Sequence, residues 1–160
     1  MLYNLIDVLF RGKVMNPQSK NNNKWVYGGI YHCTKETDKW MIITDEEWHC
    51  VDPKTIGQFT GVVDKNGTKV FEGDVISTLY HGECLMDVRW NCEILQWELT
   101  KIGTPIWQRS KSNTMDLAEI TIETVYGDEP WSVIVGNIYD NPEYAYTIKD
   151  PSRIDSDFAF

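Results

Sequence analysis

Residues Gly57–Ile76 read GQFTGVVDKNGTKVFEGDVI, and they carry the clearest signal of local structure in the chain. The runs FTGVV and TKVF are typical of β-strands, and they lie on either side of the polar segment Asp64–Gly67. The Asn and Gly of this segment tolerate positive φ, so the sequence predicts a β-hairpin.

The register of this hairpin depends on its turn. A two-residue loop pairs Val63 with Val70 and Asp64 with Lys69. A type I turn that places Gly67 in a bulge shifts these pairs by one residue. Gly67 is expected to have a positive φ in either geometry, so replacing it with Val is expected to destabilise the fold.

The pattern of short strands continues on both sides of the hairpin. The segment Glu72-Gly73-Asp74 interrupts the strand pattern before a predicted strand at Val75–Tyr80. A Gly inside a strand pattern suggests a bulge or corner. Further strands are predicted at Trp25–Tyr31, Lys39–Thr44 and on to Val51, and at Leu85–Trp90, Ile94–Leu99, Pro105–Gln108, Ile120–Tyr126 and Ser132–Val135. Helical periodicity is weak, and Thr114–Ile120 is the best place for a short helix. The prediction is a mainly β fold, a barrel or sandwich of short antiparallel strands with little helix.

The length and composition of the chain indicate which broad class of protein it belongs to. Its 160 residues suit one domain with a real core, and 42% hydrophobic content excludes a disordered chain. No run of about 18 apolar residues is present, and Asp7 interrupts the apolar start, so we expect neither a membrane span nor secretion, but a cytoplasmic protein. In a reducing cytosol the four cysteines are expected to be free thiols, mostly buried, and we expect no disulfide.

The net charge of −9 is unevenly distributed. Residues 116–160 hold ten acids against Lys149 and Arg153, whereas residues 8–35 contain five basic residues and no acid. Such asymmetry is usually a solvated surface, but it also suits contacts between subunits of a homo-oligomer.

Three motifs give the chain a family resemblance. Gly57–Ile76 resembles the signature segment of the YopX family of bacterial prophage and phage proteins. Two other motifs fit the same family: FRGK (Phe10–Lys13) with WVYG (Trp25–Gly28), and VIVGNIYDNPE (Val133–Glu143). Gly12 departs from it, because Ala is more usual there. The resemblance implies a mostly β protein with a small SH3-like barrel after the signature, and it supplies no catalytic residues.

The expected organisation is one YopX-like domain over residues 1–150, followed by a loose tail at 151–160. Within it, an N-terminal β subdomain (1–57) packed on a C-terminal barrel subdomain (58–145) is the alternative arrangement.

Two groups of residues have the chemistry of a metal site. Asp64, Glu72 and Asp74 suit Mg²⁺, but the simpler interpretation is that Asp64 caps a turn while the other two acids lie on a solvated corner. The dipeptides His32-Cys33 and His49-Cys50, with His81 and Cys84, have zinc-ligand types. Adjacent strand residues point to opposite faces, so we interpret these as buried thiols and surface histidines, with no metal or other cofactor.

The sequence contains no nucleophile turn and no phosphate-binding loop, so no catalytic residue is predicted. The preferred hypothesis is a non-catalytic interaction protein, homo-oligomeric, that binds a host or phage protein. The alternative is a nucleic-acid-directed protein, either an acidic competitor of DNA or a binder that uses residues 8–35 with Trp25 and Tyr27. Against a binder stand the net charge and the expectation that aromatic side chains fill the core. A metal-dependent hydrolase using Asp64, Glu72 and Asp74 is a third, weaker hypothesis.

Overall fold

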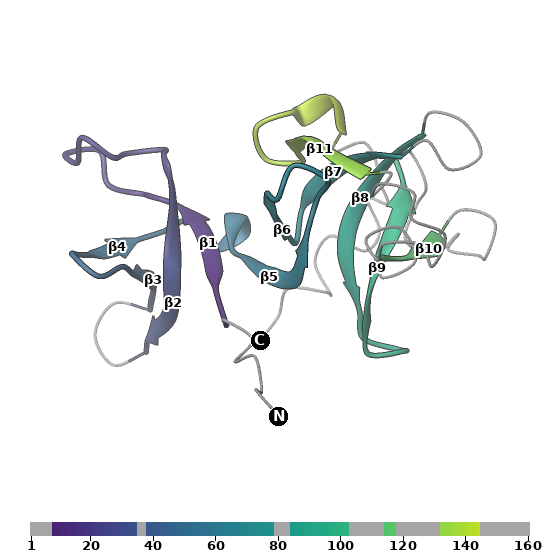
Figure 1. Cartoon of the computed structure of the whole chain (residues 1–160). Coiled ribbons are helices and arrows are strands. Elements are labelled where there is room, and N and C mark those ends of the chain that lie inside the picture. Colours follow the sequence, from purple (N-terminus) through teal and green to yellow (C-terminus); the bar gives the residue numbers. More distant parts are fainter. Residues whose placement is uncertain (1–7, 35–37, 79–83, 103–113, 118–131, 145–160) are drawn as a thin grey trace, which may run out of the picture. The chain divides into compact units, whose positions relative to one another are not determined.

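The computed structural model describes residues 8–34, 38–78, 84–102, 114–117 and 132–144. They form a mostly β structure (Figure 1), which confirms the predicted fold class. The described strands are β1 (Phe10–Lys13), β2 (Trp25–Cys33), β3 (Lys39–Ile43), β4 (Trp48–Cys50), β5 (Gly57–Val63), β6 (Lys69–Phe71), β7 (Asp74–Thr78), β8 (Cys84–Asn91), β9 (Gln96–Lys101), β10 (Thr114–Asp116) and β11 (Ser132–Asn137). The short 3-10 helix η1 (Pro53–Thr55) lies between β4 and β5. No helix within the described ranges is long and apolar enough to cross a membrane.

The chain divides into two compact units, each built on one antiparallel sheet. The first unit contains residues 1–63 and 69–72, and the second contains residues 64–68 and 73–160. The first sheet has the order β4-β3-β2-β1-β5-β6, and the second has the order β10-β9-β8-β7-β11. β5 and β6, which begin at Gly57 and Lys69, therefore belong to the first sheet.

The signature segment forms the predicted hairpin of β5 and β6. Its turn is closed by hydrogen bonds from the Gly67 N–H to the Asp64 carbonyl oxygen and from the Asp64 N–H to the Thr68 carbonyl oxygen, both 2.9 Å long. Gly67 has a φ of +79°, as predicted. Val63 pairs with Lys69, so the structure selects the type I turn with Gly67 in a bulge.

The first sheet curls over one of its faces, which we call the inner face. Val14 bridges Val51, and the Met15 N–H donates to the Cys50 carbonyl oxygen at 2.8 Å, so the chain after β4 returns to the end of β1. The curl is tight at Gly28, where a Cβ atom would lie 2.0 Å from the Ile43 carbonyl oxygen. Buried aliphatic side chains line the inner face: Val14, Ile42, Val51 and Val70.

The centre of the second sheet is buried on both faces. On one face its core consists of Ile76, Met86, Val88 and Leu99. On the other, the strand register groups Val75, Asp87 and Thr100, which are also buried. Among the described residues the sheet ends at β10 and β11, so the SH3-like closure stays a prediction.

Several strand boundaries differ from the prediction. Ile94 and Leu95 lie in the turn before β9 and are exposed, because the apolar run that suggested a strand is the loop of a hairpin. Thr114–Asp116 is a strand paired with β9, not the start of a helix. The strands predicted at 105–108 and 120–126, and the tail at 151–160, lie outside the described residues.

Candidate functional site

The outer face of the first sheet carries aromatic rings and cations from all six of its strands. Residues paired directly in an antiparallel sheet share a face, and β1 pairs Arg11 with Tyr27 and Lys13 with Trp25. Tyr31 of β2 pairs with Met41, and Cys33 pairs with Lys39. We call the following set the aromatic–cationic face: Trp25, Tyr27, Tyr31, Trp48, Phe59 and Phe71 with Arg11, Lys13, Lys39 and Lys69.

Arg11 organises the centre of this face. Its guanidinium lies 4.6 Å from the centroid of the Trp25 ring and 5.2 Å from that of Phe71, and it donates to the Glu72 carbonyl oxygen at 3.0 Å. The Phe71 ring also contacts Tyr27 and Phe59, with centroids 5.4 and 5.6 Å apart. Arg11 and Phe71 are buried, so they orient the more exposed rings around them.

Three rings of the face are open to solvent. The exposed fractions are 48% for Tyr27, 46% for Tyr31 and 60% for Trp48. Tyr31 and Trp48 form an edge-to-face pair with centroids 5.7 Å apart. Among the described residues Phe71 is the one aromatic side chain in the buried core, which is otherwise aliphatic or Met. The expectation that aromatic side chains fill the core was therefore wrong for this part of the chain, since its rings lie mainly on a sheet face.

Gly29 leaves a gap in the row of rings along β2. It lies between Tyr27 and Tyr31 on the outer face, opposite Ile43 of β3. A Cβ atom at Gly29 would have nothing within 4 Å, so the space above the backbone is open. With a rise of about 3.3 Å per residue, the two flanking tyrosines are about 13 Å apart along the strand. The gap is therefore wide enough for a planar ring.

Two acidic side chains, those of Asp38 and Glu47, lie beside histidines of the inner face. The Nε2 atom of His32 lies 2.8 Å from the Asp38 carboxylate, and the Nε2 atom of His49 lies 3.9 Å from that of Glu47. His32 stacks on Trp40 with centroids 4.1 Å apart, and both rings belong to the inner face because Trp40 and His32 are paired. Among the described strand residues, the aromatic–cationic face contains no acid.

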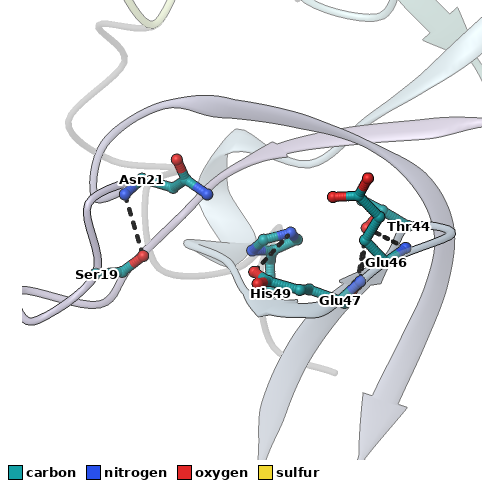
Figure 2. Close-up of polar contacts among 6 residues, drawn as sticks. All are labelled: Ser19, Asn21, Thr44, Glu46, Glu47 and His49. Atoms are coloured by element: carbon teal, nitrogen blue, oxygen red, sulfur yellow. Dashed lines mark hydrogen bonds and ion pairs between the residues drawn. The ribbon is translucent and has the colours of Figure 1, made fainter.

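The turn between β3 and β4 keeps Glu47 in this position, as Figure 2 shows. The Thr44 hydroxyl accepts hydrogen bonds from the N–H groups of Glu46 and Glu47 at 3.4 and 3.0 Å. The hydroxyl also donates to the Glu47 carbonyl oxygen at 3.0 Å. The turn thus fixes the start of β4, where alternation places Trp48 on the outer face and His49 on the inner one.

Charge is divided between the two units. The first unit has eight basic and eight acidic residues, so it is neutral, whereas the second has seven basic and sixteen acidic residues and carries the whole net charge of −9. The net charge of the chain is therefore no argument against an anionic ligand on the first sheet.

The basic residues of segment 8–35 do not all lie on one face. Arg11 and Lys13 join the aromatic rings, with the Lys13 Nζ atom 5.4 Å from the Trp25 centroid. Lys20 and Lys24 lie in and just after the polar loop, where the Asn21 N–H donates to the Ser19 hydroxyl at 3.1 Å (Figure 2). Lys35 lies outside the described residues.

Sequence reasoning missed most of the face. Lys39, Trp48 and Lys69 were not singled out, and neither was the ring of Phe59, which lies 5.1 Å from the Lys69 Nζ atom. The signal available was the alternation of Trp25, Tyr27 and Tyr31 along one strand, which places three rings on one side.

The Asp64, Glu72 and Asp74 set has structural roles. Asp64 is buried and caps its turn: the N–H groups of Asn66 and Thr68 donate to its Oδ1 atom at 2.9 Å, and that of Ile134 donates to its Oδ2 atom at 3.2 Å. Burial by itself raises the pKa of Asp64, but hydrogen bonds from the three backbone N–H groups and from the Thr68 side chain outweigh it and hold the pKa below its ordinary value. Asp74 is buried, so its predicted place on a solvated corner was wrong.

The histidines and cysteines do not form a cluster. Across the described part of the chain, no group of three or more His, Cys, Asp or Glu residues could hold a metal ion. All four cysteines are free; three are half-buried and Cys92 is exposed, so the prediction of mostly buried thiols was wrong. The His49 side chain is only 10% exposed, contrary to its predicted surface position, and His81 lies outside the described residues.

The second sheet has a polar face of a different kind. Asp87 forms an ion pair with Arg89, and the Asn91 side-chain amide donates to the Glu98 carboxylate at 2.9 Å. Asp87 and Glu98 are buried, so these groups form an internal ionic network. This network is better suited to fixing the structure than to receiving a substrate.

Comparison with known proteins identifies a matching family. The family model described as YopX protein matches residues 10–144, which cover most of the chain. A search of curated proteins found no match. The match contains all ten residues of the aromatic–cationic face.

Proposed function

This chain belongs to the YopX family, and we propose that it is a non-catalytic interaction protein that binds an anionic partner on the aromatic–cationic face. One observation carries the proposal: three exposed rings and three lysines share one face of the first sheet. Exposed rings surrounded by polar groups are typical of binding surfaces. The resemblance to phage and prophage proteins and the four free cysteines suit a role in the reducing cytoplasm of a bacterial host.

A titration with anionic polymers tests this binding surface. The probes are polyglutamate, heparin, single-stranded DNA and duplex DNA, and the readout is the indole N–H signal of Trp48 in the full chain, identified by comparison with Trp48→Phe. We expect at least one polymer to shift this signal while the signal of Trp90, which is 42% exposed in the second unit, stays in place. If no polymer shifts the Trp48 signal, the face is not a binding surface for anions.

A second surface supports the proposed homo-oligomer. At the hairpin of β8 and β9, Trp90 and Trp97 form an edge-to-face pair with centroids 5.1 Å apart, and Ile94 and Leu95 beside them are 56% and 72% exposed. We propose that another copy of the chain covers this apolar tip. Light scattering at micromolar concentration tests this: a mass near the 18.6 kDa of one chain contradicts it.

A further inference from the structure

The aromatic–cationic face places cations beside rings between β1 and β2 and again between β5 and β6. Lys13 is paired with Trp25, and Lys69 lies over the ring of Phe59, so a ring and a cation recur as neighbours. A single-stranded nucleic acid has the complementary repeat, because each nucleotide carries one planar base and one phosphate. Proteins that bind single strands without sequence preference combine stacking rings with a cationic track in this way.

The open gap at Gly29 adds a place for a base. Tyr27 and Tyr31 stand on either side of it, and Ile43 lies across the strand pair. Apart from its chain neighbours, no residue has an atom within 4 Å of a Cβ built at Gly29, so the space directly above the backbone is open, and we expect a base to enter there. In a duplex the bases are already stacked on one another, so their faces are not available to these rings.

We propose that the aromatic–cationic face is a binding site for single-stranded nucleic acid, with bases stacked on Tyr27, Tyr31 and Trp48 and phosphates against Lys13, Lys39 and Lys69. The proposal rests on the proposed function, since it names the partner of the same face. Arg11 is buried and has a positioning role: it holds Trp25 and Phe71 in place beneath the ligand. Sequence preference is expected to be weak, because every base has a ring face.

Fluorescence anisotropy of labelled single strands, dT20 and rU20, tests the site in the full chain. The two strands distinguish DNA from RNA as the source of the ligand. We expect binding that duplex DNA of equal length does not reproduce. Contacts with three lysines predict that log K falls with log salt concentration with a slope of about −2, from about −0.7 per phosphate on single strands.

Substitutions on the aromatic–cationic face distinguish an effect on binding from an effect on folding. Trp48→Ala is expected to weaken binding about tenfold, in line with the loss of one stacked base. Gly29→Leu is expected to weaken it at least as much by filling the gap, while thermal melting is nearly unchanged because the new side chain meets open space. Lys39→Ala should reduce the salt slope by about 0.7, whereas the matched control Lys101→Ala, which changes an exposed lysine of β9 in the second unit, should change neither affinity nor slope.

Three results would overturn the proposal. One is the absence of binding to dT20 and rU20 up to about 100 µM, the weak end of ordinary non-specific affinity. Another is binding that Trp48→Ala and Gly29→Leu both leave unchanged, which would place the strand elsewhere. The third is a Trp48 signal that polyglutamate shifts and single strands do not. In that case the face binds an acidic protein, so the proposed function stands and the nucleic-acid inference fails.

Discussion

The two sheets of this protein use their faces differently. The first sheet buries aliphatic residues on its inner face and leaves Tyr27, Tyr31 and Trp48 open on its outer face, in a unit with no net charge. The second sheet is buried on both faces at its centre, contains an internal ionic network, and belongs to the unit that carries the charge of −9. The net charge and the aromatic content of the whole chain therefore describe neither unit, and the binding that we propose lies on the sheet with an open face.

The largest stability effect is expected at Asp64, in the second unit. Asp64→Ala removes an acceptor from three N–H groups, and since hydrogen bonds to charged groups contribute about 1.5–3 kcal/mol, we expect a loss of about 3 kcal/mol in the free energy of unfolding. Chemical denaturation measures it. Asp45→Ala, an exposed acid in the turn after β3, is the matched control and should stay within about 0.5 kcal/mol.

The same residue predicts a pH dependence. The pKa of Asp64 is lowered in the folded state, so its contribution is fully present above its ordinary pKa of 3.8 and is lost as pH falls through the folded value. The difference in unfolding free energy between the wild type and Asp64→Asn should therefore shrink in acid. A difference that stays constant from neutral pH to well below 3.8 would mean that the carboxylate charge does not stabilise the turn.

Gly67→Val is expected to cost about 1–3 kcal/mol, because a β-branched residue at a φ of +79° is strained. Gly67→Asn is the comparison variant, since Asn adopts positive φ more readily, and it should cost less. The melting temperature of each variant measures the effect. Equal melting temperatures for Gly67→Val and the wild type would contradict the prediction that Val is strained at this position.

A smaller effect, opposite in sign, is expected at the tip of the second sheet. Leu95 has a φ of +55° and is exposed, so Leu95→Asn should raise the unfolding free energy by about 0.5–1 kcal/mol and also weaken self-association. Ile94→Asn is the matched control: it removes an exposed apolar side chain without relieving a positive φ. We expect Ile94→Asn to weaken self-association without the gain in stability, as sedimentation velocity and denaturation would show.

Local signals in the sequence were enough to predict much of the fold. The turn at Asp64–Gly67 was predicted because Asn and Gly favour positive φ, and β2, β3, β7 and β8 were predicted from β-branched and aromatic runs. The register of the hairpin was not decided by these signals. It depends on the Asp64 side chain, which accepts from Asn66 and Thr68 and so stabilises the longer turn.

The candidate site was predicted only in part, because it depends on pairing between distant strands. Trp25 and Tyr27 were singled out from their neighbouring charges, but Trp48 and Lys69 reach the same face through the pairing of β3 with β4 and of β5 with β6. Alternation along β2 groups its rings without showing which face is buried. The bridge from Val14 to Val51 decides that, and a contact across 37 residues has no local signature.

The central claim is that the outer face of the first sheet is where the protein binds its ligand. Photo-crosslinking with a single strand that contains 5-iodouracil, followed by mass spectrometry of the attached peptides, tests it most directly. We predict adducts on Tyr27, Tyr31 or Trp48, and a strong reduction of these adducts in Gly29→Leu. Adducts confined to residues 73–160, or adducts on the first sheet that Gly29→Leu leaves at the wild-type level, would contradict the account.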